Sequence, residues 1–155
     1  MRARFVVPLA GLIAVLAVAG CGGGDSSSST AALSKSEFLA QGNTICEKGD
    51  KAINEAGKKV FTQSQAPSQA TQEKFVTDTV IPSIQSQIDA IDALPAPSGD
   101  EDQVQAIVDA AQSALDKAKQ DPSLITDQSQ GSDPFAQANK LTDDYGLTKC
   151  GGDSG

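Results

Sequence analysis

Apolar residues recur every three to four positions along most of the chain, which is the spacing of one buried face of an α-helix. The first such stretch follows a capping box, in which Ser34 accepts a hydrogen bond from a free backbone N–H and Glu37 bonds back to the serine. Its stripe consists of Phe38, Gly42, Ile45, Gly49, Ile53, Ala56 and Val60. We therefore expect one helix that ends near Val60, in which Gly42 and Gly49 permit the close approach of another backbone.

A second helix is predicted from about Ser68 to Leu94. Its apolar stripe runs through Val80 or Ile81, Ile84, Ile88 and Ile91. Pro82 lies in the middle of this stretch, where it removes one backbone hydrogen bond and disfavours the helical conformation at Ile81. We expect a kink or a break there, and we expect Pro95 to end the helix.

A third helix is predicted to open with a second capping box, formed by Ser98 and Glu101. Acidic residues lie at its positive end and lysines at its negative end, as the helix macrodipole favours. Its buried stripe consists of Val104, Ile107, Val108, Ala111, Leu115 and Ala118. Pro122 closes this helix, and a loop rich in Ser, Asp and Gln is expected through Gly131.

A fourth helix is predicted after Asp133 and Pro134, which are typical of an N-cap and a first-turn position. Its apolar residues are Phe135, Ala138 and Leu141. It is expected to end at Gly146, since glycine tolerates the left-handed conformation that closes many helices. Four helices with short connections and no alternating strand pattern predict an all-α fold, an antiparallel helical bundle of about four helices over residues 33–151 with a tail at 152–155.

The N-terminal segment has the arrangement of a secretory signal. Arg2 and Arg4 precede an uncharged apolar stretch that is too short for a transmembrane helix, and small residues then lead to Cys21. This ending resembles the lipobox of bacterial lipoproteins, whose cysteine receives a diacylglycerol before the signal is cleaved. The resemblance implies that residues 1–20 are removed and that Cys21, carrying diacylglycerol and palmitate, anchors the chain in the lipid bilayer. An ordinary signal peptide and a single-span anchor are the alternatives.

Residues 22–30 are Gly, Asp, Ser and Thr, with no apolar side chain to pack. We therefore expect residues 21–32 to form a flexible tether between the lipid and the helical domain. The predicted location is the cell membrane, with the domain lipid-anchored on the extracytoplasmic side.

Net charge and residue types exclude several classes of function. Loss of residues 1–20 lowers Lys and Arg from 12 to 10 and leaves all 20 Asp and Glu, so the formal charge becomes about −10. Such a surface disfavours binding to nucleic acid, which contacts proteins through Lys and Arg. It also disfavours flat adhesion to an anionic membrane.

The chain has no His, and its one Met is the initiator, so with Cys21 acylated only Cys46 and Cys150 could supply a soft ligand to a transition metal or haem. Every His-dependent catalytic triad is absent. We expect no cofactor and no enzymatic activity.

Acylation of Cys21 leaves Cys46 and Cys150 as a pair near the two ends of the folded region. Outside the cytoplasm, two such thiols favour a structural disulfide. The chain-entropy relation assigns about 4–5 kcal/mol to the closure of so long a loop. A redox-active or metal-binding pair is the alternative, but the sequence has no Cys-x-x-Cys and no neighbouring His to lower a thiol pKa.

Several segments resemble a group of uncharacterised lipoproteins from high-GC actinobacteria. They are residues 33–38 leading to 45–46, 81–84 through 94–97, 99–104 and 145–151. The last of them, with its cysteine, is the most distinctive. This resemblance covers nearly the whole domain and implies a secreted, lipid-anchored helical domain with a cysteine pair. It implies no activity and no catalytic residue.

The sequence favours a non-enzymatic binding or interaction module of the cell envelope, whose partner is an envelope protein or a small ligand. Gly42 and Gly49 are candidates for leaving a groove open between helices, although close packing is the simpler explanation. The alternatives are a hydrolase that uses paired carboxylates and a site for Ca²⁺ or Mg²⁺. Their candidate residues lie at predicted helix ends, where carboxylates also serve as solvated caps. These carboxylates are Asp100, Glu101, Asp102, Asp143 and Asp144.

Overall fold

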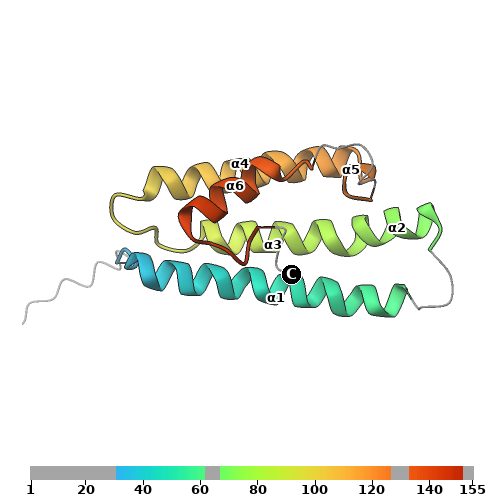
Figure 1. Cartoon of the computed structure of the whole chain (residues 1–155), viewed down its shortest axis with the longest axis horizontal. Helices are drawn as coiled ribbons and strands as arrows, with labels where there is room; N and C mark the ends of the chain where they lie inside the picture. The colour runs from blue at the N-terminus through green and yellow to red at the C-terminus, as the bar shows by residue number, and fades with distance from the viewer. Residues whose placement is uncertain (1–30, 62–66, 127–132, 152–155) are drawn as a thin grey trace, which may run out of the picture.

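The computed structural model describes residues 31–61, 67–126 and 133–151, and every regular element in these ranges is helical. The predicted signal peptide, Cys21, most of the predicted tether and the tail at 152–155 lie outside the described residues. The long helical segments alternate in direction, so the fold is the all-α antiparallel bundle that the sequence predicts (Figure 1). The elements in order are α1 (Lys35–Val60), α2 (Gln69–Phe75), the π-helical turn η1 (Val76–Val80), α3 (Ile81–Asp92), α4 (Glu101–Gln120), α5 (Ser123–Thr126) and α6 (Ala136–Tyr145).

Helix α1 begins at its capping box, as predicted. Ser34 Oγ accepts a hydrogen bond from the Glu37 backbone N–H at 3.3 Å, and the Ser34 N–H donates to Glu37 Oε2 at 3.0 Å. The buried residues of α1 are Phe38, Gly42 and Cys46. Val60 at its C-terminal end is 43% exposed, so the apolar stripe of α1 contributes to the core mainly through its N-terminal half.

The second predicted helix runs from α2 through α3, and Ser68 caps it by accepting the Thr71 N–H at 3.2 Å. The irregularity predicted at Pro82 takes the form of η1, the π-helical turn that directly precedes α3. There the Ile81 N–H donates to Val76 O, five residues back. Because Pro82 has no N–H to offer the preceding turn, one wider turn shifts the hydrogen-bond pattern without ending the helix.

The start of α4 differs from the prediction, because the capping box of Ser98 and Glu101 does not form. Gly99 has a φ of 89°, and the Asp100 N–H donates to Pro97 O at 3.0 Å. The chain therefore turns before the helix, and Asp100 takes the N-cap position without a side-chain capping bond. Glu101 Oε2 accepts the Gly99 N–H at 2.7 Å instead.

Two further differences lie in the C-terminal third. The short helix α5 occupies a stretch that the sequence pattern assigns to a loop. Helix α6 begins later than predicted, at Ala136. Asp133 Oδ1 accepts the Phe135 N–H at 2.8 Å, which forms a turn ahead of the helix. The predicted end of α6 is confirmed, since Gly146 has a φ of 107°.

Helix α3 packs against α1 on one side and against α4 on the other, and α6 packs on α4 (Figure 1). The core between them is mainly aliphatic. Its aromatic members, Phe38 and Tyr145, meet edge to face with ring centroids 6.0 Å apart. The remaining members of the buried cluster are Cys46, Val76, Ile81, Ile88, Ile91, Val104, Ile107, Val108, Leu115 and Leu147.

At Gly42 and Gly49 the atoms nearest to the missing Cβ belong to side chains of other segments. A Cβ at Gly42 would lie 2.5 Å from Leu147 Cδ2, and a Cβ at Gly49 would lie 2.2 Å from the side chain of Gln87. Leu147 is fully buried, so it fills the space beside Gly42. These glycines are places of close packing, and any groove between the helices has another origin.

Candidate functional site

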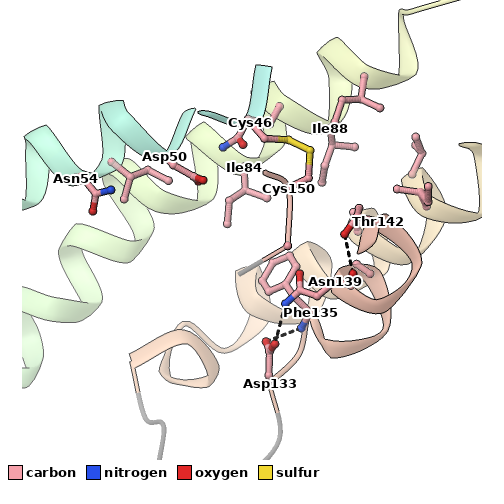
Figure 2. Close-up of a pocket in the computed structure, with 18 residues that line it drawn as sticks. Cys46, Asp50, Asn54, Ile84, Ile88, Asp133, Phe135, Asn139, Thr142 and Cys150 are labelled. Atoms are coloured by element: carbon pink, nitrogen blue, oxygen red, sulfur yellow. Dashed lines mark hydrogen bonds between the residues drawn. A yellow bond between two sulfur atoms is a disulfide. The ribbon is translucent and has the colours of Figure 1, made fainter. Parts of the chain in front are cut away.

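A cavity of about 580 Å³ lies between α1, α3, α4 and α6, beside the segment that follows α6 (Figure 2). Its walls are mostly apolar, because the predicted stripes of α3 and α4 face it. The apolar lining comprises Ile53, Ile84, Ile88, Ile91, Ile107, Val108, Ala111, Phe135 and Ala138. Sites for small molecules are typically about 300–1,000 Å³ with mainly apolar walls, so this cavity is the candidate site.

One wall of the cavity is the segment after α6, and a disulfide ties this segment to α1. Cys46 and Cys150 both line the cavity, with their sulfur atoms 2.03 Å and their Cα atoms 5.1 Å apart. The bridge confirms the pairing predicted from the sequence. The segment after α6, which forms one wall of the cavity, is therefore covalently attached to α1.

Noncovalent contacts hold the same segment against α1. The Leu147 N–H donates to Thr142 O at 2.8 Å, which closes the end of α6 and turns Leu147 into the core. Asn43 of α1 then makes two bonds to the backbone of this segment. Its Nδ2 donates to Gly146 O at 3.3 Å, and its Oδ1 accepts the Lys149 N–H at 2.9 Å.

A separate cluster joins the N-terminal ends of α1 and α4 to the C-terminal end of α6. Tyr145 OH donates to Asp100 Oδ2 at 2.9 Å, while Lys35 Nζ lies 3.2 Å from the same oxygen and 4.1 Å from the Tyr145 ring centroid. The hydrogen bond from Tyr145, and next the one from Lys35, lowers the pKa of Asp100. Burial, and next the bond to Asp100, raises the pKa of Tyr145. Asp100 is therefore ionised at neutral pH, which suits a structural tie and not a proton donor.

Polar side chains also face the cavity, and most of them are bonded to their own helix. The two oxygens of Asp133 accept the Phe135 N–H at 2.8 Å and Asn139 Nδ2 at 3.1 Å (Figure 2). Thr142 Oγ1 donates to Asn139 O at 2.8 Å. These bonds fix the first turns of α6 and leave Asp133 with both oxygens engaged. The polar lining comprises Asp50, Asn54, Gln87, Asp133, Asn139 and Thr142.

Asp50 differs from the other polar groups of the lining. It lies on the α1 side of the cavity, whereas Asp133 lies on the α6 side (Figure 2). Within the described residues its carboxylate meets no hydrogen-bond donor and no cation, and burial raises its pKa with no opposing contribution. Lys and Arg are missing from the described lining, so the formal charges at the cavity are the carboxylates of Asp50 and Asp133.

The other candidate residues of the sequence analysis are not among the residues that line the cavity. Three of them are at the start of α4 and two are near the end of α6, where Asp144 pairs with Lys140 at 2.6 Å. They are Asp100, Glu101, Asp102, Asp143 and Asp144. In the part of the chain that the structure describes, no group of three His, Cys, Asp or Glu side chains is placed to hold a metal ion. Cys21 lies outside the described residues.

Asp50 carries a sequence signal that the analysis of motifs missed. It follows the buried Cys46 by four positions and precedes Ile53 by three, so on α1 it lies at the edge of the apolar stripe. A carboxylate at such an edge is either a solvated group or a functional one. Asn43 has no comparable signal, because the backbone groups it contacts are 103 and 106 positions away.

Comparison with protein-family models, with curated proteins and with solved structures finds no match to this chain. None of the helices in the described residues is both long enough and apolar enough to cross a membrane. Function is therefore inferred from the chemistry of the site itself.

Proposed function

We propose that this chain is a lipid-anchored lipoprotein of the cell envelope, which binds a small ligand in the cavity between α1, α3, α4 and α6 and catalyses no reaction. The observation that carries the proposal is the cavity itself, with its volume of about 580 Å³, its aliphatic walls and its few polar groups. Proteins that bind small molecules use sites of this size and this mixture of groups.

The location is supported by the signal-like segment that ends at Cys21 and by the Gly/Ser tether that follows it. The disulfide agrees with an oxidising compartment outside the cytoplasm. Intact-mass analysis of the protein from its native host tests this part of the proposal. We expect a chain that begins at Cys21 and carries a glyceride with its acyl chains. A mature start at another residue, or a Cys21 without lipid, would contradict it.

The cavity supports binding better than hydrolysis by carboxylates. That chemistry needs an acid and a second carboxylate on either side of the bond that breaks. The cavity presents Asp50 and Asp133, but both oxygens of Asp133 already accept hydrogen bonds from the start of α6. One carboxylate is left, and a single carboxylate on an apolar wall suits the recognition of a ligand.

A substitution that fills the cavity tests the binding site. Ala111 of α4 lines the cavity, whereas Ala106 of the same helix is exposed. In the mature chain carrying Cys21→Ser, which is not acylated, Ala111→Leu is expected to weaken binding of the neutral fluorescent probe N-phenylnaphthylamine by about tenfold or more, because the larger side chain occupies the site. Ala106→Leu is the matched control and is expected to leave binding unchanged. Equal affinity of the two variants, with equal helix content by circular dichroism, would contradict the proposal.

A further inference from the structure

The formal charges that face the cavity are all of one sign within the described residues. Asp50 and Asp133 contribute carboxylates, and the lining holds no Lys or Arg. The mature chain adds a long-range field of the same sign, with 20 acidic residues against 10 basic ones once residues 1–20 are removed. A fatty acid or a phosphate headgroup would meet like charge here and no counter-ion, so an anionic ligand is disfavoured.

Asp50 is the group placed to recognise a ligand. It lies at the edge of the apolar stripe of α1, partly buried on the cavity wall, and among the described residues it has no hydrogen-bond or ion-pair partner. Partial burial raises the pKa of this carboxylate, and a cation or a strong donor that reaches it makes a charge-assisted hydrogen bond. Asn54 lies one helical turn further along α1 and also lines the cavity, so its amide oxygen offers a second acceptor on the same wall.

Resting on the proposed binding function, we propose that the cavity selects apolar ammonium compounds, whose charged nitrogen lies against Asp50 and whose hydrocarbon body lies against Ile84 and Ile88 (Figure 2). The carboxylate supplies the charge complementarity, and Asn54 accepts a further N–H of the ligand. The aliphatic side chains of α3 and α4 bury the apolar part. Asp133, whose oxygens are engaged, holds α6 in place and contributes to the field.

Three probes with a phenyl ring, the same number of carbon atoms and different charge test the selection: phenylbutylammonium, phenylbutanol and phenylbutyrate. Each is titrated calorimetrically into the mature chain carrying Cys21→Ser at neutral pH. The ammonium is expected to bind about tenfold more tightly than the alcohol, because it adds a charge-assisted hydrogen bond on a partly exposed wall. The carboxylate is expected to bind most weakly of the three.

Asp50→Asn keeps the shape of the side chain and removes its charge. It is expected to weaken binding of the ammonium by about tenfold and to leave the affinity for the alcohol unchanged. The variant should therefore bind the two probes with similar affinity. Glu47→Gln is the matched control, since Glu47 is exposed on the same helix and does not line the cavity. It removes the same charge and is expected to preserve the ammonium preference.

The outcomes separate this inference from the binding function on which it rests. In one outcome the alcohol binds and Ala111→Leu removes that binding, so the binding site stands. If the ammonium then binds no more tightly than the alcohol, or if Asp50→Asn leaves its tighter binding intact, the cation preference is wrong. If phenylbutyrate binds most tightly of the three, the cation preference is likewise wrong and the binding site stands. If none of the three probes binds, the binding function fails, and the preference fails with it.

Discussion

Reduction of the Cys46–Cys150 disulfide is expected to lower the free energy of unfolding by about 4–5 kcal/mol. The bridge joins residues 104 positions apart, and a cross-link around a loop of about 100 residues is worth about 4.7 kcal/mol in the chain-entropy relation. Natural domains are stable by only about 5–15 kcal/mol, so this single bond supplies a large share. The effect arises mainly in the unfolded chain, which gains conformations when the bridge opens.

The reduced protein is expected to remain folded in the absence of denaturant. Leu147 stays fully buried beside Gly42, and Asn43 keeps its two hydrogen bonds to the segment after α6. The thiol of Cys46, at 3% exposure, is apolar enough to remain in the core. Reduction therefore shifts the unfolding transition and leaves the helical fold in place.

Urea unfolding followed by circular dichroism, with and without reductant, measures this shift, and alkylation with mass analysis verifies that the bridge is open. The slope of the free energy against urea is expected to rise on reduction, because the unfolded chain becomes more expanded. The double variant Cys46→Ala with Cys150→Ala is the control. Its free energy of unfolding should be the same with and without reductant and close to that of the reduced protein. A shift below about 1 kcal/mol in verified reduced protein would refute the reasoning.

Three further changes test the core, the cavity and the cluster at the helix ends. Leu115 is fully buried, so Leu115→Ala is expected to cost about 2–5 kcal/mol in urea unfolding, against less than about 1 kcal/mol for Val60→Ala at a 43% exposed position; similar losses would contradict the assigned core. Burial raises the pKa of Asp50, so its ionisation opposes folding above that pKa. Asp50→Asn is therefore expected to stabilise the free protein by less than about 1 kcal/mol at neutral pH, with a gain that vanishes below about pH 4, and a destabilised variant would be contrary evidence. The pKa of Asp100 is lowered first by Tyr145, so ionised Asp100 stabilises the fold above its ordinary pKa, and this contribution is lost as the pH falls through the lowered value. Tyr145→Phe is expected to raise the pKa of Asp100 in a carboxyl NMR titration, and an unchanged titration would rule out the assigned bond.

The elements that the sequence predicts well depend on contacts between near neighbours. The Ser34 capping box and the end of α6 at Gly146 are determined by residues within a few positions, so a local pattern identifies them. The Ser98 capping box has an equally good local pattern and does not form. The N-cap is instead Asp100, whose carboxylate accepts a hydrogen bond from Tyr145, 45 positions away, and a local pattern holds no information about that contact.

The cavity is predictable from the sequence only in part. The apolar stripes identify the faces of α3 and α4 that turn inward, and Asp50, at the edge of the stripe of α1, is the charged residue that α1 contributes to the described lining. The space beside α6 depends on where the segment after it attaches to α1. That attachment uses Asn43 and the fit of Leu147 against Gly42, which are contacts over about a hundred positions with no periodic signature.

The place of the disulfide beside the cavity gives it a second role. The cavity is partly open to solvent, since the exposed Asn54 is part of its lining. Its shape therefore depends on contacts that hold α6 and the segment after it in place relative to α1 and α3. The Cys46–Cys150 bridge and the bond between Tyr145 and Asp100 are placed to do this, because they attach the end of α6 and the segment after it to α1 and α4. Reduction is then expected to weaken binding of the fluorescent probe under conditions in which both forms are folded. Equal affinity of the oxidised and reduced proteins would limit the bridge to a role in stability.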